Sequence, residues 1–357
     1  MLGTIVDLSG PVASVGVAVR NGLQMRVDEA NAAGGINGRK IRLLVEDNSY
    51  DPKRSVLAAQ KLVLNEKVFA IVGHIGTAHN EAVLPFLIEN NVINFAPQSG
   101  GKPMFDPPDR MKVAIIQPNL ATSETGTRYL VQQKKHTKVC VFYQDDDFGM
   151  DYLKGAENAL KSMNMALTEK VSYKRGATDY SSQVTRLKSA GCQLVVIGGI
   201  IRETVGVMNE ANKQEFTPDF VGGESSYSIL VTQLGGKAVE NLYAAHNMPN
   251  FYADDPDKKV RDWVNAYKTR FNIDPVVSTA YAYYAMDVFI AAATKAGANL
   301  TTDAFLNTME TTAFPGFMGG PSFKVTKTNR LGTSQLRVSQ VRNGRWVQAS
   351  DWLTVQR

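Results

Sequence analysis

The sequence predicts an α/β protein built on parallel sheets, and three observations support this. Short apolar runs alternate with longer amphipathic runs in the order βαβαβα between residues 3 and 90. Glycine-rich turns such as Gly34-Gly35 separate these runs. A second set of alternating runs in the same style begins near residue 122, so the chain resembles two similar lobes. Strands joined through helices imply parallel pairing with right-handed crossovers.

The first set of elements follows from apolar runs bounded by turn residues. Its predicted strands span residues 3–8, 41–46, 68–72, 92–96 and 113–117. Its predicted helices span residues 14–33, 53–65 and 78–90. A loop containing Ser9-Gly10-Pro11 precedes the first helix, and Asp51-Pro52 opens the second.

The second set repeats this pattern, and the last third departs from it. The second set has predicted helices at 122–132, 150–162, 180–189 and 203–213, with predicted strands at 138–143, 166–172, 193–198 and 220–222. The last third has predicted helices at 257–272, 279–296 and 303–311, then a hairpin over 335–348 on an Asn-Gly turn. These last elements are expected to complete both sheets. The chain would then cross between lobes near Pro118, residues 247–249 and residues 326–328.

The composition is that of a folded chain with scattered charge. The 357 residues suffice for two or three domains, and 44% are hydrophobic. The net charge is +5, but the Lys and Arg residues form no basic patch interleaved with aromatic residues, so nucleic acid is not an expected partner. No apolar stretch reaches the roughly 18 residues that a membrane span needs.

The beginning of the sequence and its two cysteines are the features that relate to the cellular compartment of the protein. MLGTIVDLSG has no basic, apolar and cleavage regions in the order of a signal peptide, so an exported protein would already have lost its leader. Cys140 and Cys192 lie in or beside Val-rich runs. Buried thiols are the favoured interpretation, a disulfide between the two remains open, and no zinc site is expected.

The stretch AIVGHIGTAHNEA, residues 70–82, is the candidate functional centre. A buried strand is followed by Gly73 and Gly76, and Thr77 then occupies the position expected for a helix N-cap. The first amides of a helix lack partners within it, and the helix dipole adds about half a positive charge there. The turn therefore suits an anion. The alternative is a plain threonine cap with no ligand.

Several stretches resemble one family. SGPVASVG, DEANAAGGINGRKIRLLVEDNSYDPKRSVLAAQKLV, VGHIGTAHN, YQDDDFGMDYLKGAENAL, DYSSQVTRLKSAGCQLVVIGG and VGGE are similar, in order and spacing, to the leucine/isoleucine/valine-type periplasmic solute-binding proteins of ABC transporters. The resemblance implies two Rossmann-like lobes joined by three crossover segments, with a ligand cleft between them. It also implies a periplasmic protein that delivers a small molecule to a membrane permease.

The resemblance places part of a ligand site in the first lobe. Thr77 matches the Ser or Thr that holds the ligand α-carboxylate. Gln98, Ser99 and Gly100 fall where the family uses a carbonyl and a Thr for the carboxylate and the ammonium. Gly100 lacks that hydroxyl, which Ser99 is expected to supply. Val15 falls where an aromatic residue often lines the side-chain pocket.

The second lobe is expected to supply the rest of the site. Phe148 matches the aromatic residue before Gly in the acidic loop, which argues for a cleft wall. Ile200 falls where the amino-acid binders usually carry Tyr. Glu224 matches the acid that pairs with the ligand ammonium. A buried carboxylate needs a donor, and Arg202 or loop amides are the other candidates to satisfy Glu224.

Two ligand classes remain open. Val15 and Ile200 in place of large rings imply a roomier pocket that suits an aromatic or branched carboxylic acid, whereas Glu224 favours an amino acid. His79 is expected on a solvated helix face. The triple-aspartate run at 145–147 lacks the spacing of a calcium loop, so no metal is expected.

The expected function is that of a receptor that closes on its ligand by hinge motion. No GxGxxG follows the first strand and no catalytic set is present, so neither an enzyme nor a cofactor is expected. Lobe one is expected to comprise residues 1–118 with 249–326, and lobe two residues 119–248 with 327–357. A monomer is expected. A ligand-sensing regulator with the same lobes is the second functional class.

Overall fold

The computed structural model describes residues 1–355. The chain divides into two compact units. Unit 1 comprises Met1–Ile116 and Phe251–Thr333, and unit 2 comprises Gln117–Asn250 and Ser334–Arg357. The chain therefore passes from one unit to the other three times.

Unit 1 is built on a five-stranded parallel sheet with the strand order β2-β1-β3-β4-β5. The strands are β1 Leu2–Val6, β2 Leu43–Asp47, β3 Ala70–Val72, β4 Ile93–Phe95 and β5 Lys112–Val113. Gly3 pairs with Leu44 in β2 and with Ile71 in β3, so β1 lies in the middle of the first three strands. The predicted α/β class with parallel strands is confirmed here.

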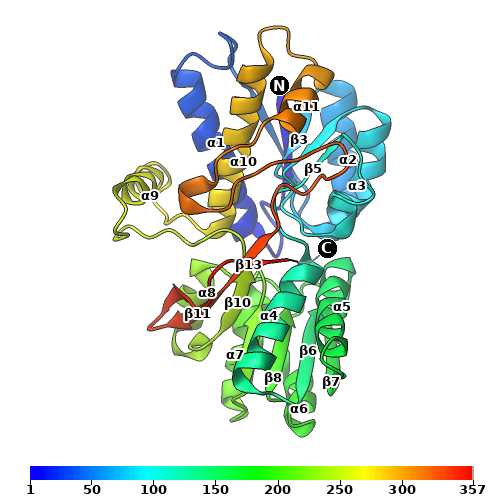
Figure 1. Ribbon diagram of the computed structural model, residues 1–357, viewed down its shortest axis with the longest axis vertical. Coiled ribbons are helices and arrows are strands. Elements are labelled where there is room, and N and C mark those ends of the chain that lie inside the picture. Colours follow the sequence, from blue (N-terminus) through cyan, green and yellow to red (C-terminus); the bar gives the residue numbers. More distant parts are fainter. Residues whose placement is uncertain (356–357) are drawn as a thin grey trace. The chain divides into compact units, whose positions relative to one another are not determined.

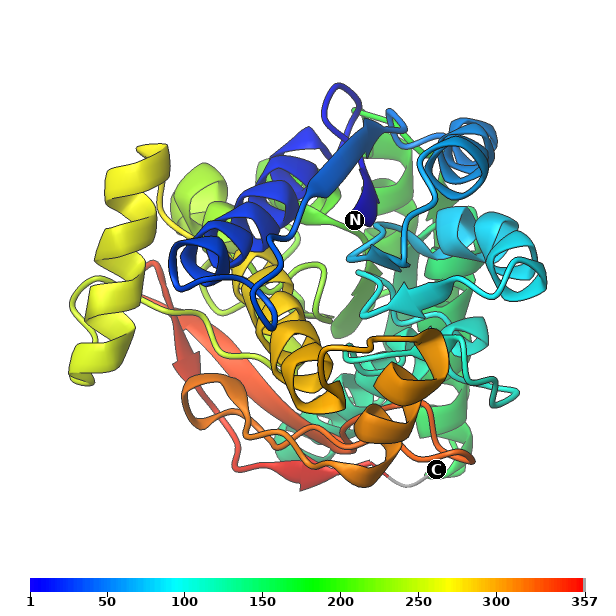
Figure 2. The same cartoon turned by 90° about the horizontal axis from the view of Figure 1, so that it is seen from above.

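Helices cover both faces of this sheet (Figures 1 and 2). The helices of unit 1 are α1 Ala13–Ala32, α2 Pro52–Gln60, α3 Thr77–Glu89, α9 Lys258–Phe271, α10 Val277–Ala296 and α11 Thr302–Thr311, with short turns at Lys61–Asn65, Lys102–Met104 and Phe317–Gly319. Of these, α9 lies to the side, away from the sheet (Figure 1). Helix α1 packs against α10, and α2 packs against α3. Leu62 of the turn after α2, together with Val83 and Leu87 of α3, forms a buried aliphatic cluster with Ile71 of β3.

The other face of the sheet carries aromatic packing. Phe95 of β4 meets Phe289 of α10 edge-on, with ring centroids 5.3 Å apart. Phe305 of α11 packs against both rings, at 5.8 and 4.7 Å. Edge-to-face contacts of this kind add about 0.5–1.5 kcal/mol per pair to the burial of the rings. The second segment of unit 1, Phe251–Thr333, is thus fixed to the sheet formed by strands within residues 2–113.

A buried arginine anchors the segment that precedes the third crossing. Arg330 is fully buried, and its guanidinium forms an ion pair with Glu310 at 3.0 Å. It also donates to the carbonyl oxygens of Arg110, Lys112 and Thr326 at 2.6–2.9 Å. Because a buried charge is costly unless it is paired and hydrogen-bonded, this full set of partners stabilises the arginine.

Unit 2 holds an eight-stranded sheet with the order β12-β11-β10-β9-β8-β6-β7, in which β13 also pairs with β11. The strands are β6 Val139–Gln144, β7 Glu169–Tyr173, β8 Leu194–Gly198, β9 Asp219–Gly222, β10 Tyr243–His246, β11 Gln335–Arg342, β12 Arg345–Gln348 and β13 Leu353–Thr354. β6 to β10 are parallel, and β11 pairs antiparallel with β10 and β12. The hairpin predicted over 335–348 is confirmed.

The helices of unit 2 also lie on both faces of its sheet (Figure 1). They are α4 Asn119–Lys134, α5 Asp147–Lys161, α6 Ser181–Ser189, α7 Ile201–Lys213 and α8 Ile229–Gly235, followed by a 3-10 turn at Gly236–Val239. α4 packs against α5, and their residues Leu130, Leu153 and Leu160 join Val141 and Val196 of the sheet in one buried cluster. α7 packs against α6 and α8.

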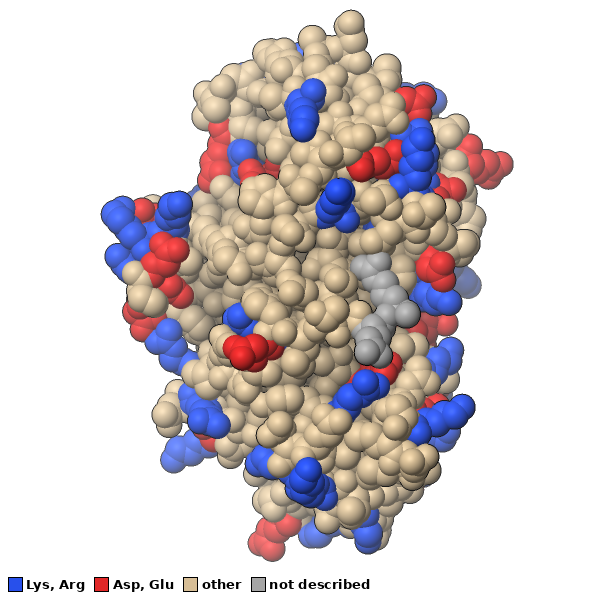
Figure 3. Space-filling model, viewed as in Figure 1, with Lys and Arg blue, Asp and Glu red and all other residues tan. Residues whose placement is uncertain are grey.

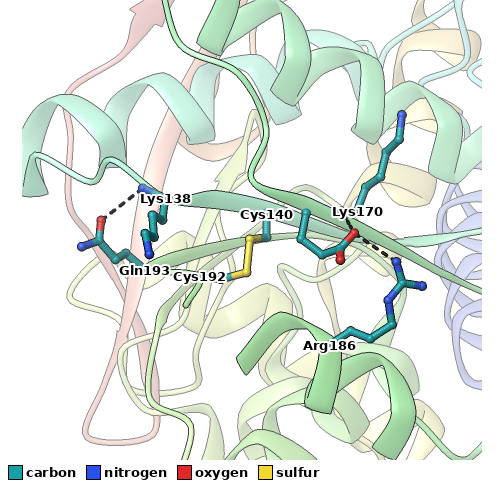
Figure 4. The surroundings of a disulfide bond; sticks show 7 residues. Lys138, Cys140, Lys170, Arg186, Cys192 and Gln193 are labelled. Carbon is teal, nitrogen blue, oxygen red and sulfur yellow. Dashed lines mark hydrogen bonds and ion pairs between the residues drawn. A yellow bond between two sulfur atoms is a disulfide. The ribbon is translucent and has the colours of Figure 1, made fainter. Parts of the chain in front are cut away.

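The structure shows that Cys140 and Cys192 form a disulfide, so the prediction of two buried thiols is wrong. Figure 4 shows the bond joining Cys140 of β6 to Cys192, which lies two residues ahead of β8. The two strands are neighbours, and the Gln193 amide donates to the Lys138 carbonyl oxygen at 2.8 Å. This pairing brings the two Cα atoms to 5.9 Å, a separation usual for disulfides. The sequence could not show that the two runs are adjacent strands.

Other elements differ from their predicted bounds. α8 and β10 were not predicted, because their segments are short and follow a Gly- and Ser-rich loop. The helix predicted over 53–65 ends as α2 at Gln60 and continues as a π-helical turn over Lys61–Asn65. The fifth strand is only Lys112–Val113, after which Ala114 makes a single bridge to Leu331.

The surface charge is dispersed. Figure 3 shows Lys and Arg side chains interspersed with Asp and Glu on the visible face. Across residues 1–355, no helix combines the length and hydropathy needed to cross a membrane.

We predict that the disulfide stabilises the native state by about 2–4 kcal/mol, because it closes a loop of 52 residues in the unfolded chain. The double variant Cys140→Ala with Cys192→Ala should lose this free energy of unfolding in urea denaturation. Reducing the wild-type protein should reproduce the loss, whereas reductant should leave the double variant unchanged. Equal stability of oxidised wild type and double variant would contradict the prediction.

Candidate functional site

The site in unit 1 centres on the start of α3. Gly76 is the N-cap, with φ 94°, and Thr77 is the first helical residue, so the prediction of Thr77 as the cap is wrong. A positive φ favours glycine. A Cβ on residue 76 would also lie 2.3 Å from Nδ1 of His79. Glycine is therefore the residue that this turn requires. The side chain of Thr77 points to the next loop, where its Oγ1 lies 3.1 Å from Ser99 Oγ.

A second loop lies directly beside this turn. The Gln98 amide donates to the His74 carbonyl oxygen at 2.9 Å, and the Gly76 amide donates to the Gln98 carbonyl oxygen at 3.2 Å. This pairing of the loops after β3 and β4 brings Thr77 and Ser99 together. Ser99 Oγ also accepts the Gly101 amide at 3.1 Å. Four of the residues predicted for the first lobe, Thr77, Gln98, Ser99 and Gly100, therefore lie in one place.

In the corresponding turn ahead of α1, the main-chain amides are already occupied by a carboxylate side chain of the protein itself. The side chain of Asp7 is fully buried and accepts the amides of Ser9, Gly10 and Val12 at 2.5–3.1 Å. At α3 the cap is Gly76, which has no side chain that can act in this way. Val15, the fifth residue predicted in this unit, lies in the first turn of α1 and is partly exposed.

Two histidines lie under the α3 turn. His79 is buried, and its ring stacks on Tyr50 with centroids 4.4 Å apart, so the prediction of a solvated His79 is wrong. The apolar pattern of the helix could not reveal this contact, because Tyr50 lies in a loop. His74 is fully buried, and burial lowers its pKa to about 3. His74 therefore carries no charge at neutral pH.

In unit 2, hydroxyl groups tie together the two loops that carry predicted site residues. Ile200 precedes α7, and Glu224 follows β9. Ser225 Oγ donates to the Gly199 carbonyl oxygen at 2.8 Å. Ser226 Oγ lies 2.9 Å from Thr204 Oγ1, which donates to the carbonyl oxygen of Ile200 at 2.6 Å. The two loops are therefore linked within this unit.

Glu224 and Arg202 have separate partners. An oxygen of Glu224 accepts the main-chain amide of Asn247 at 3.1 Å, so a loop amide is among the partners of this carboxylate. Arg202 donates to Glu203 at 2.9 Å. Glu203 is buried. Desolvation lowers the pKa of Arg202, but the hydrogen bond and the charge of Glu203 help to raise it, so the net pKa is higher than usual.

Phe148 lies in the first turn of α5, because the helix begins at Asp147 with Asp146 as its N-cap. The predicted start of this helix at residue 150 is therefore three residues too late. Phe148 is buried, with its ring centroid 5.1 Å from that of Tyr152. An aspartate that can act as N-cap, two residues after the strand, was the signal for this earlier start.

Sequence reasoning missed Asp151 and Tyr152. Tyr152 is buried, and a Cβ on Gly223 would lie 2.1 Å from its hydroxyl oxygen, so its ring supports the Glu224 loop. Asp151 accepts a hydrogen bond from Asn119 Nδ2 at 3.2 Å. Burial raises the pKa of Asp151 to about 6, against the lowering effects of Asn119 and Lys154. Nothing in the sequence distinguishes this acid from its exposed neighbours.

We predict that Asp151→Asn stabilises the protein at pH 7 by about 3 kcal/mol, the free energy that corresponds to a rise of its pKa from 3.8 to about 6. The folded-state pKa lies above the unfolded value, so ionised Asp151 costs stability as the pH rises from about 4 to about 6. The gain should therefore vanish near pH 4. Urea denaturation between pH 4 and pH 7 measures it, with Asp145→Asn, at an exposed neighbour, as the control. A gain that does not depend on pH would contradict the assignment.

No group of three or more His, Cys, Asp or Glu residues arranged to hold a metal ion occurs within residues 1–355. The site residues are hydroxyl groups, main-chain amides, apolar side chains and single carboxylates. Such a set suits recognition of a small polar molecule by hydrogen bonds.

The comparisons with known proteins agree with this architecture. Over 330 residues the chain is 26% identical to "Leu/Ile/Val-binding protein homolog 2" of Brucella abortus, covering 90% of this chain and 85% of that protein. A fatty acid ABC transporter substrate-binding protein from Thermomonospora curvata matches at a TM-score of 0.90 and 22% identity, covering 99% and 92% of the two chains.

A solute-binding protein from R. palustris in complex with benzoate matches at a TM-score of 0.86 and 14% identity, covering 97% and 94% of the two chains. These structural similarities show the fold. The sequence profile described as periplasmic binding protein matches residues 1–345. The chain therefore belongs to the periplasmic binding protein family and is a solute-binding protein of the leucine/isoleucine/valine-binding type.

Proposed function

We propose that this protein is the extracytoplasmic receptor of an ABC importer and binds a small, carboxylate-bearing ligand. The leading ligand class is a branched-chain or other hydrophobic amino acid. The observation that carries the proposal is the pair of hydroxyls of Thr77 and Ser99 at the start of α3, 3.1 Å apart. Hydroxyl and main-chain donors at a helix N-terminus are well suited to an anion.

The carboxylate is proposed to bind at Thr77, Ser99 and the neighbouring main chain of Gln98 and Gly100. Charge-assisted hydrogen bonds of this kind are about twice as strong as neutral ones. A micromolar dissociation constant corresponds to about −8 kcal/mol. One such site together with a buried apolar group is sufficient for that affinity.

Unit 2 is proposed to complete the site by hinge closure. Glu224 would receive the ammonium group, while Ile200 and Phe148, with Val15 of unit 1, would surround the side chain. Arg202 is proposed to border the site from its position beside Ile200. No catalytic step is proposed, since the family relatives are binding proteins by name.

The alternative ligand is a carboxylic acid without an amino group. Glu224 already accepts an amide hydrogen from Asn247, and Val15 and Ile200 leave room for a flat or extended group. The fatty acid and benzoate named for the two structural neighbours belong to this class. A ligand-sensing regulator is the other functional class.

A periplasmic location and a membrane permease partner are proposed from family membership. The disulfide between Cys140 and Cys192 supports an oxidising compartment. The protein is proposed to act as a monomer.

We predict that Thr77→Val, which keeps the shape of the side chain and removes its hydroxyl, weakens binding of the acid about tenfold. Isothermal titration calorimetry with leucine, valine, phenylalanine, benzoate and octanoate identifies the acid, and leucinamide or benzamide tests the need for the carboxylate. Thr185→Val, at an exposed residue of α6, is the matched control. If no carboxylate in the panel binds the wild-type protein, the proposed ligand class is wrong.

Glu224→Gln separates the two ligand classes. It removes the negative charge and keeps an oxygen for the Asn247 amide. For an amino acid ligand, we predict at least a tenfold weaker affinity, because the ammonium group loses its counter-charge. For benzoate or octanoate, the affinity should stay within about twofold or improve. A fall for both classes would show that Glu224 only maintains the loop.

A further inference from the structure

The side chain of Asn80 cross-links the turn that precedes α3. Asn80 is buried, and its Nδ2 donates to the carbonyl oxygens of His74 at 2.9 Å and of Gly76 at 2.8 Å. The main-chain amide of Asn80 also donates to the Gly76 carbonyl oxygen, at 3.0 Å. The Gly76 carbonyl group is therefore held from two directions by one residue.

This contact fixes the direction of a neighbouring amide. In a planar trans peptide, the C=O and N–H groups point in opposite directions. Because the Gly76 carbonyl points into the helix toward Asn80, the N–H of Thr77 in the same peptide unit points away from the helix. That is the direction of an approaching anion at a helix N-terminus.

A second asparagine holds Asn80 in place. Asn94 of β4 is buried, and its Nδ2 donates to Asn80 Oδ1 at 3.2 Å. This bond fixes the orientation of the Asn80 amide, since the opposite orientation would face its oxygen toward two carbonyl oxygens. The chain of contacts thus runs from the sheet through two side-chain amides to the turn.

We infer that Asn80 is a positioning residue for the carboxylate site: by holding the carbonyl groups of His74 and Gly76, it aims the first amide of α3 at the ligand. The inference rests on the proposed function, because it assigns a role in that same site. Asn80 touches the turn and not the ligand. Its removal should therefore impair recognition of a negative charge more than recognition of the rest of the molecule.

The test compares Asn80→Ala and Asn80→Asp with Asn90→Ala. Asn90 is the matched control because its Nδ2 also donates to a carbonyl oxygen four residues earlier, that of Phe86 at 2.9 Å, but at the exposed far end of α3. Asn80→Asp keeps the size of the side chain, removes both donors and places a negative charge under the turn. Asn80→Ala removes the donors without adding a charge.

The first readout is discrimination between an acid and its amide, using leucine with leucinamide or benzoate with benzamide. We expect Asn80→Ala to weaken binding of the acid about tenfold and that of the amide less than twofold. Asn80→Asp should weaken the acid further, and Asn90→Ala should change neither. Equal losses for acid and amide would overturn the inference, because they indicate a purely structural role, and so would unchanged binding of both.

The second readout needs no ligand. Hydrogen exchange of the peptide covering residues 73–79 should be about tenfold faster in Asn80→Ala than in the wild type, with unchanged exchange in β1 and α1. Unchanged exchange of this peptide would overturn the inference. Absence of carboxylate binding to the wild type overturns the proposed function instead, and the exchange data then decide whether Asn80 orders the turn.

Discussion

The candidate site depends on the pairing of two loops in unit 1. The main chain of Gln98 bonds to His74 and Gly76, and this places the loop after β4 against the start of α3. Thr77 and Ser99 are 22 residues apart in sequence, and the pairing of β3 with β4, continued by this contact between the loops, makes them neighbours. The side-chain amide of Asn80 donates to the carbonyl oxygens of His74 and Gly76, so the His74 carbonyl is held by both Gln98 and Asn80. The geometry of the turn is thus determined before any ligand arrives.

The two units order the loops that carry their candidate site residues with different chemical groups. Unit 1 orders its turn with main-chain bonds and buried amides. Unit 2 joins the loops of Ile200 and Glu224 through hydroxyls, chiefly Ser225, Ser226 and Thr204. Short hydroxyl side chains hold loops closely because they lose little conformational entropy on burial. Both arrangements give the precisely placed polar groups that a small-molecule site requires.

The fold class was predictable from the sequence because alternating apolar and amphipathic runs dictate parallel strands and covering helices. The start of α3 at the candidate site was predictable, since glycines followed by Thr77 mark a helix start. Its geometry was not, because a cap depends on φ, and Gly76 rather than Thr77 makes the turn. The pairing of Cys140 with Cys192 and the burial of His79 depend on which strands and loops become neighbours. Periodicity carries no such information.

The link between β6 and β8 has a consequence for the intact chain. Residues 140–192 include α5, β7 and α6, and the two ends of this segment are covalently joined. A protease that cuts one exposed turn within the segment, such as the one at Gly176, would leave both fragments attached. A nicked molecule would therefore migrate as a single species on a denaturing gel without reductant, and its two fragments would separate only after the disulfide is reduced.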